Sequence, residues 1–243
     1  MTNDHVVTGT ATREGTVAPS GDAVTVHVHA DGTTAVAVVD GIGHSFRVAA
    51  IAQLIADVTA RIAARRGPLA GLLTGTELVA DPGAGDETEP DAVAIVAVAQ
   101  PGDERVRIAW VGDCRAYVLT EDGQVQRLTV DHNLATQLAM AGYDGEITRR
   151  ASQWVRTTVA TASVATVAEA WTDRPLAVVL TTDGVHDQLS HDVLRTLLVQ
   201  HQDAPQTLAQ ALVAAAEPGP DGVRDDATAV VIKLNSTTQV PSS

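Results

Sequence analysis

Aromatic residues, cysteine and lysine are scarce in this chain of 243 residues. Phe, Trp and Tyr make up only 2% of it, so the packing of its core must depend on Val, Ala, Leu and Ile. The single cysteine, Cys114, cannot form an internal disulfide, and no apolar run near the amino terminus has the length of a signal peptide or a membrane span. We therefore expect a cytoplasmic protein without a membrane partner.

Positive charge is scarce as well. Lys and Arg total 16 against 30 Asp and Glu, which gives a formal net charge of −14. Such a chain repels nucleic acid instead of attracting it, so we expect no nucleic-acid partner. With 45% hydrophobic residues, the chain is long enough for one domain with its own core and too short for two. We expect this domain to span residues 1–234 and residues 235–243 to form a polar tail.

Aspartate stands at the end or the beginning of apolar runs in four places. The stretches are 21–22 (Gly-Asp), 40–44 (Asp-Gly-Ile-Gly-His), 182–184 (Thr-Asp-Gly) and 224–228 (Arg-Asp-Asp-Ala-Thr). Because a strand fixes the backbone up to its last residue, carboxylates at strand ends can converge, and converging anions repel unless Mg²⁺ or Mn²⁺ lies between them. For one stretch alone an Asp-Gly turn is the simpler interpretation, and for 31–32 and 121–123 we adopt it.

Five motifs, in this order, resemble those of the metal-dependent protein phosphatases of the PP2C (PPM) family, bacterial type, over roughly the whole chain. They are 38–44 (Val-Val-Asp-Gly-Ile-Gly-His), 110–117 (Trp-Val-Gly-Asp-Cys-Arg-Ala-Tyr), 128–132 (Leu-Thr-Val-Asp-His), 182–187 (Thr-Asp-Gly-Val-His-Asp) and 225–228 (Asp-Asp-Ala-Thr, where the family has Asp-Asn). Any one motif is weak, but five in order are a strong signal. The resemblance implies an α+β fold, a four-layer α/β/β/α sandwich of two mainly antiparallel sheets flanked by helices.

The same resemblance implies hydrolysis of phosphoserine and phosphothreonine in phosphorylated protein substrates, with two Mn²⁺ or Mg²⁺ ions and a water activated between them. Asp40 would bridge the ions and Gly41 would offer its backbone carbonyl to one, while Asp22, Asp183 and Asp225 would complete the other. Asp40 and Asp183 are the catalytic residues in this prediction. Carboxylate and carbonyl oxygens suit Mn²⁺ or Mg²⁺ better than zinc.

A third ion is also implied, with Asp131 and Asp187 as candidates beside Asp183. An equally good interpretation makes Asp131 and Asp187 helix-cap or turn residues. Among the histidines, we interpret His27 and His29 as residues of a sheet surface and His132 as structural support.

Two segments depart from the family pattern. The family's phosphate-binding arginine lies about five residues before an Asn-Glu-Asp-like triplet, whereas here only Asp22 of that triplet is retained and Arg13 lies nine residues upstream. Arg13 is the candidate for phosphate binding.

The loop after Asp40 is one residue shorter than in many bacterial members, which displaces His44 and leaves no identifiable proton donor. The family has a flap near 143–156, and its positive charges here are Arg149, Arg150 and Arg156.

Three functions stay open at this point. The first is an active phosphatase, and the second is a degenerate family member that binds phosphoprotein or metal with little turnover, as the altered segments around Asp22 and His44 suggest. The third is an unrelated metal-binding or structural α/β domain with chance Asp-Gly turns, which five ordered motifs disfavour.

Hydrophobic periodicity predicts the elements of the fold. Residues 23–30 and 33–39 form a hairpin that ends at Asp40, a helix covers 48–62, and strands cover 92–99 and 123–128. Residues 107–110 and 115–120 are predicted as a second hairpin around Gly112 and Asp113. A short helix at 133–141 ends at Gly142, and two helices after Asp183 begin at Ser190 and near 203–205. Residues 225–234 close the last sheet, and 81–90 form an exposed loop.

Overall fold

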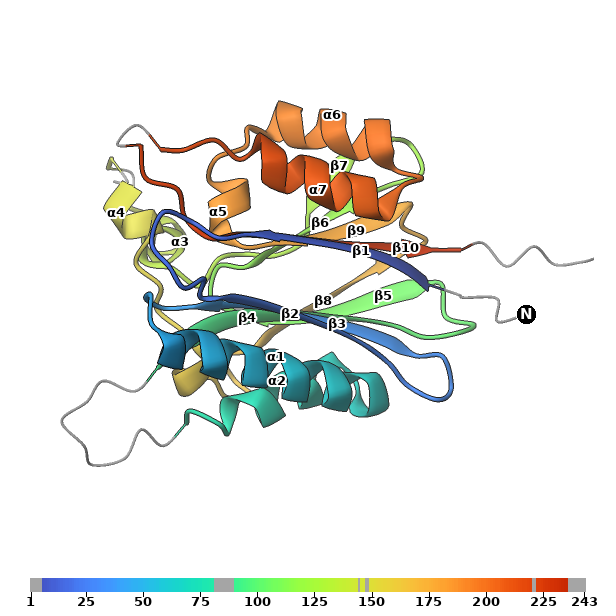
Figure 1. Ribbon diagram of the computed structural model, residues 1–243, viewed down its shortest axis with the longest axis horizontal. Helices are drawn as coiled ribbons and strands as arrows, with labels where there is room; N and C mark the ends of the chain where they lie inside the picture. The colour runs from blue at the N-terminus through green and yellow to red at the C-terminus, as the bar shows by residue number, and fades with distance from the viewer. Residues whose placement is uncertain (1–5, 81–89, 144, 147–148, 220–221, 236–243) are drawn as a thin grey trace, which may run out of the picture.

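The computed structural model describes residues 6–80, 90–143, 145–146, 149–219 and 222–235. Two five-stranded antiparallel sheets pack face to face, and helices cover both outer surfaces, so the chain forms four layers (Figure 1). The predicted α+β sandwich is confirmed. Three groups of buried side chains fill it, one between the sheets and one under each helical layer.

Each sheet has its own set of strands. In spatial order, sheet A contains β1 (Val6–Arg13), β10 (Ala227–Leu234), β9 (Ala177–Thr181), β6 (Arg115–Leu119) and β7 (Val125–Arg127). Sheet B contains β2 (Asp22–Val28), β3 (Thr34–Gly41), β4 (Ala92–Ala99), β5 (Arg105–Val111) and β8 (Ala168–Asp173).

Helices cover the sheets unevenly. Sheet B is covered by α1 (Phe46–Arg66) and α2 (Pro68–Thr76), and sheet A by α6 (His191–His201) and α7 (Pro205–Ala215). At one end of the sandwich, on the left in Figure 1, lie the short helices α3 (Leu134–Met140), α4 (Arg149–Ser152) and α5 (Asp183–His186). The 3-10 helix η1 (Val159–Thr161) contacts α2 and β4.

Strand β4 confirms the predicted strand 92–99 and shows why an unbroken apolar run belongs at the centre of this fold. All eight of its residues are buried. Ala94 and Val96 belong to the cluster under α1 and α2, whereas Val93 and Ile95 belong to the cluster between the sheets. Because successive side chains of a strand point to opposite faces, a strand covered on both faces must be apolar throughout.

Helix α1 confirms the predicted helix, and small residues dominate its buried face. Ala52, Ala56 and Ala60 lie on that face. The helix begins after Ser45, whose hydroxyl accepts a hydrogen bond from the Val48 amide at 3.1 Å, and it ends at Gly67. Alanine side chains allow the helix to lie close to sheet B, so the core is filled without aromatic residues.

The predicted hairpin around Gly112 and Asp113 is wrong. Strand β5 belongs to sheet B and β6 to sheet A, so the chain crosses from one sheet to the other at this point. Gly112 has a φ of 90°, and a Cβ there would lie 2.3 Å from the Cβ of Val93. Glycine is therefore required where the chain passes close to β4. A Gly-Asp pair between two apolar runs looks the same in sequence whether the runs pair or separate.

Other predictions have mixed outcomes. The cap of α6 is confirmed, since the Ser190 hydroxyl accepts a hydrogen bond from the Val193 amide at 3.3 Å. Helix α7 begins at Pro205 after Ala204, and Asp203 instead forms an ion pair with Lys233. Strands β1 and β8 were not predicted. The predicted loop 81–90 and tail 235–243 lie almost entirely outside the described residues, and the division into domain and tail stays a prediction.

In the part of the chain that the structure describes, none of the helices combines the length and the apolar composition that crossing a membrane requires.

Candidate functional site

Asp22 and Asp40 face each other directly across two paired strands. Asp22 is the first residue of β2 and is the register partner of Asp40, near the end of β3. Val24 and Val38 lie on the same faces of these strands as the two aspartates and pack between the sheets. Both carboxylates therefore point into the space between the sheets, at the end where α5 lies. Like charges in such a pair destabilise a sheet, so this arrangement needs a physical reason other than folding.

Sheet A brings further carboxylates to the same place. Asp183 follows β9 and opens α5, and Asp225 lies just before β10. The sheets are joined here by the Thr182 hydroxyl, which donates to Asp22 Oδ2 at 2.9 Å and accepts from the Thr228 amide at 2.9 Å. Four of the predicted ligands thus come together from four separate segments.

The closeness of these groups has electrostatic consequences. Burial, followed by the Asp183 and Asp22 carboxylates, raises the pKa of Asp40 well above its usual value. Burial and then Asp225 do the same to the pKa of Asp183. The pKa of Asp22 rises to about 7, chiefly through burial. A cluster of acids whose ionisation is this unfavourable is suited to a bound cation, which would reverse each of these shifts.

The donor set fits hard divalent ions. Carboxylate oxygens predominate, and Asp22 Oδ1 is buried without a hydrogen-bond partner. Among the described residues, no three His, Cys, Asp or Glu side chains form a ready-made metal cage. Mg²⁺ and similar ions usually keep several waters and take only one or two carboxylates each, so such a cage is not required. The Gly41 backbone is close by, because a Cβ there would lie 2.9 Å from the Gly21 carbonyl oxygen.

Asp113 belongs to this cluster, although no role was predicted for it from the sequence. Burial, followed by the Asp131 carboxylate, raises its pKa to about 6. The charge of Asp113 also raises the pKa values of Asp40 and Asp183. The signal in the sequence was the same as for the predicted ligands, an aspartate next to an apolar strand, but the hairpin interpretation concealed it.

Asp131, predicted as a third-ion ligand, is already neutralised. Arg115 Nη2 binds its Oδ2 at 2.8 Å, and Arg127 pairs with its Oδ1. Its side chain is only 6% exposed, so two guanidinium groups occupy the space that a cation would need. Asp187 is close enough to Asp183 for its charge to raise the pKa of Asp183, and its Oδ1 lies 3.8 Å from Arg115 Nη2. The structure therefore favours Asp113 and Asp187 over Asp131 beside Asp183.

Arg13 does not reach the carboxylates. It lies on the same face of β1 as Ala11, which packs in the cluster beneath α6 and α7. Its Nη2 donates to the Ala216 carbonyl at 2.6 Å, just after α7. Strand alternation thus turns the guanidinium to the outer face of sheet A, away from Asp22 and Asp40, and the structure does not support the predicted phosphate contact.

Asp226 fixes the long loop between β1 and β2. Its Oδ1 accepts from the Gly15 amide and its Oδ2 from the Gly21 amide, each at 2.7 Å, and it is 5% exposed. His44 Nδ1 lies 3.9 Å from Oδ2, at the rim of the site. The carboxylate thereby sets the position of Gly21, and with it Asp22.

Asp226→Asn would restore the residue typical of the family, yet we expect it to weaken this protein. An amide has one acceptor oxygen, so one of the two glycine N–H groups would face an NH₂ group and stay unsatisfied, at a cost of roughly 1–3 kcal/mol. Melting curves should show a loss of several degrees, and a Mn²⁺ titration should show weaker binding. Asp173→Asn, an exposed carboxylate on β8, is the control, and equal melting temperatures for both variants would contradict this role.

His132 and His186 have structural roles. His132 Nδ1 accepts from the Gly112 amide at 3.3 Å, and its ring stacks on Trp110 with centroids 6.1 Å apart, which confirms the predicted supporting role. His186 is buried beside the Thr181 hydroxyl, 2.8 Å from its Nδ1. Burial lowers the pKa of His186 well below its usual value, so the ring stays neutral.

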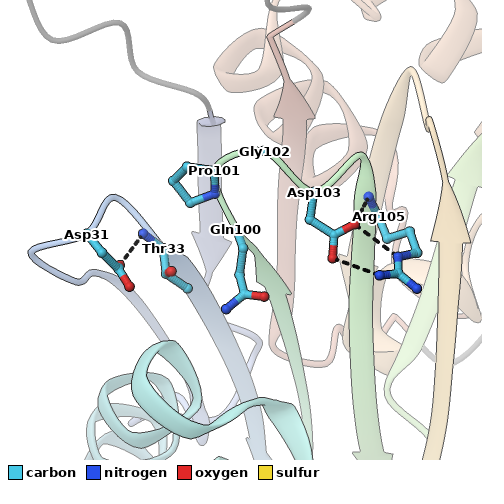
Figure 2. A pocket seen from close by; sticks show the side chains of 7 residues that line it. All are labelled: Asp31, Thr33, Gln100, Pro101, Gly102, Asp103 and Arg105. Carbon is cyan, nitrogen blue, oxygen red and sulfur yellow. Dashed lines mark hydrogen bonds and ion pairs between the residues drawn. The ribbon is translucent and has the colours of Figure 1, made fainter.

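A separate hollow lies at the opposite end of sheet B, between the turns that follow β2 and β4 (Figure 2). Its two carboxylates already have partners, since Asp31 Oδ1 accepts from the Thr33 amide at 2.8 Å and Asp103 binds Arg105 Nε at 2.9 Å. The first pair confirms that Asp31 and Gly32 form a turn. Both carboxylates of this hollow are thus engaged within the protein.

Comparisons with known proteins agree with this geometry. The family model of Stage II sporulation protein E (SpoIIE) matches residues 30–235. A search of curated proteins finds no significant match. Among solved structures, the S. agalactiae serine/threonine phosphatase superposes with a TM-score of 0.80 at 17% identity, covering 95% of this chain and 100% of that chain.

Two further structures show the same fold. Staphylococcus aureus serine/threonine phosphatase Stp1 has a TM-score of 0.71 at 18% identity and covers 95% of each chain. The catalytic domain of serine/threonine phosphatase PstP, in complex with two manganese ions, has a TM-score of 0.65 at 19% identity and covers 94% of this chain and 98% of that chain. The chain therefore belongs to the SpoIIE family and has the PP2C-like fold of bacterial serine/threonine phosphatases.

Proposed function

We propose that this protein hydrolyses phosphoserine and phosphothreonine in proteins with the help of two Mn²⁺ or Mg²⁺ ions. The observation that carries the proposal is the convergence of Asp22, Asp40, Asp183 and Asp225 at one end of the two sheets, where burial and neighbouring carboxylates disfavour the ionisation of Asp22, Asp40 and Asp183. The manganese ions of the PstP domain support the choice of metal.

The residues have distinct roles in this proposal. Asp40, whose pKa is raised by the carboxylates of Asp183, Asp22, Asp113 and Asp225, would contact both ions, and the Gly41 carbonyl, Asp22, Asp183 and Asp225 would complete their shells. Asp113 and Asp187 would serve a third ion. When bound, the ions neutralise the phosphoryl oxygens and lower the pKa of a coordinated water toward about 7.

The chain's own groups hold this arrangement in place. The Thr182 hydroxyl orients Asp22, and Asp226 holds the loop that leads to it. Phosphate recognition then depends on the ions and not on Arg13, whose guanidinium lies on the outer face of sheet A.

A second candidate is a degenerate family member that binds metal or phosphoprotein with little turnover. It is favoured by the position of Arg13, whose guanidinium donates to the Ala216 carbonyl on the outer face of sheet A. Retention of the carboxylates, with their unfavourable electrostatics, argues for metal binding in either case.

One assay separates these functions. Phosphate release from a phosphothreonine peptide is measured with millimolar Mn²⁺ and with EDTA, and we expect release only in Mn²⁺. Metal binding is followed in parallel by the shift in melting temperature. A thermal shift without phosphate release identifies the degenerate protein. If Mn²⁺ causes neither phosphate release nor a thermal shift, both candidates are overturned.

A further inference from the structure

An open groove of about 460 Å³ begins beside the carboxylate cluster. It is lined by Ile42, Arg150, Gln153, Trp154, Val155 and Thr158. Ile42 directly follows Gly41, so this wall of the groove adjoins the candidate metal site. It lies at the end of the sandwich where α4 and the start of α1 are found (Figure 1). Its volume falls in the range of ligand-binding clefts.

The apolar wall of this groove is exposed although its backbone is fixed. Trp154 is 54% exposed and Ile42 is 49% exposed. The Trp154 carbonyl accepts from the Leu134 amide at 2.9 Å, and the Arg156 amide donates to the His132 carbonyl at 2.7 Å. On the other wall, the Ile42 amide donates to the Asp91 carbonyl at 2.9 Å. The wall is therefore formed before any partner binds, which lowers the entropic cost of binding.

The charges around the groove indicate which kind of ligand it could bind. The chain carries a formal net charge of −14, yet the groove is lined by Arg150, and the Arg156 guanidinium lies 5.7 Å from the centre of the Trp154 ring. No carboxylate lines it. A phosphorylated peptide segment is anionic at the phosphate and apolar or neutral beside it, which matches a groove with an apolar wall and two arginines at the edge of a metal site.

We propose that this groove binds a large apolar side chain next to the phosphorylated residue of the substrate protein, so that Ile42 and Trp154 select the substrate sequence. The inference rests on the proposed phosphatase function, because the phosphate must lie at the carboxylate cluster for its neighbour to reach the groove. Trp154 would be a specificity-determining residue that does not take part in hydrolysis.

The test compares two phosphothreonine peptides that differ only in having Leu or Gly at the flanking positions, with p-nitrophenyl phosphate as a substrate that has no flanking residue. With Mn²⁺, the wild-type protein should have a kcat/KM at least about tenfold higher for the Leu peptide, the fold-change that burial of one large aliphatic side chain provides. Trp154→Ala should reduce this preference to near unity and leave p-nitrophenyl phosphate hydrolysis unchanged. Trp154→Phe should keep most of the preference.

Trp171→Ala is the matched control, since Trp171 is 64% exposed on β8, outside the groove. Equal kcat/KM for the two peptides in the wild-type protein, or an equal loss in both tryptophan variants, would overturn the inference. An equal loss for p-nitrophenyl phosphate and peptide in Trp154→Ala would do so as well. If the wild-type protein hydrolyses none of these substrates, the proposed function fails, and calorimetric binding of the same two peptides in Mn²⁺ then tests the groove by itself.

Discussion

An Asp40→Asn variant is expected to lose Mn²⁺-dependent phosphate release by several orders of magnitude. Asp40 is the register partner of Asp22 and lies within the electrostatic reach of Asp183, Asp113 and Asp225, and it is the carboxylate that we propose would contact both ions. An amide keeps the shape of the side chain and removes the charge that holds the metal. Because the loss concerns turnover itself, p-nitrophenyl phosphate is expected to fail as completely as a phosphopeptide.

The same variant should not unfold. In the chelated wild-type protein at pH 8, ionising Asp40 is disfavoured by burial and by its neighbours, and asparagine removes that cost. The chelated variant should therefore melt no lower than the chelated wild-type protein, while Mn²⁺ should raise its melting temperature much less. Asp173→Asn, on an exposed part of β8, is the control for loss of charge alone. Substantial Mn²⁺-dependent activity in Asp40→Asn would end the two-metal proposal.

Mn²⁺ is expected to stabilise the folded protein, and more at pH 8 than at pH 6.5. The carboxylates converge only in the folded state, so Mn²⁺ at about 100 times its dissociation constant should add roughly 2.7 kcal/mol. In the chelated protein the opposite pH trend is expected. The pKa of Asp22 is about 7 when folded against an ordinary 3.8, so the folded state binds a proton that the unfolded state has released.

The direction in which the stability of the chelated protein changes with pH follows from this difference in proton binding. A raised folded pKa contributes stability that is complete below the ordinary pKa of 3.8 and is lost as pH rises through the folded value, by about 1.4 kcal/mol per pH unit for each such group. Asp22, Asp40 and Asp183 all act in this direction between pH 6.5 and 8, where the buried His186 stays neutral. Chelated protein should melt lower at pH 8 than at pH 6.5, and Mn²⁺ should remove most of this difference, because carboxylates that hold a metal are deprotonated in the folded state as they are in the unfolded state. Calorimetric scans without a difference between Mn²⁺ and EDTA would argue against metal binding.

Local patterns in the sequence predicted a helix or strand well where one hydrophobic periodicity extended over the whole element. The run at 92–99 and the spacing of apolar residues in α1 each allow a single interpretation, because a strand buried on both faces and a helix with one buried face have different periods. Strand β1 was missed since its residues are mostly half-exposed and it gains its pairing from β10, more than 200 residues away in the chain. The relevant information lies in the partner and not in the strand.

The sequence by itself determined which segments end in carboxylates, and the order of five motifs was enough to indicate the family and the kind of site. Only the tertiary structure decided which carboxylates meet. Pairing of β2 with β3 puts Asp22 opposite Asp40, and the crossing of the chain at Gly112 brings Asp113 to them, while two arginines neutralise Asp131 and strand alternation turns Arg13 away. Register, face and neighbouring charge are relations between distant segments, and no local pattern of residues contains them.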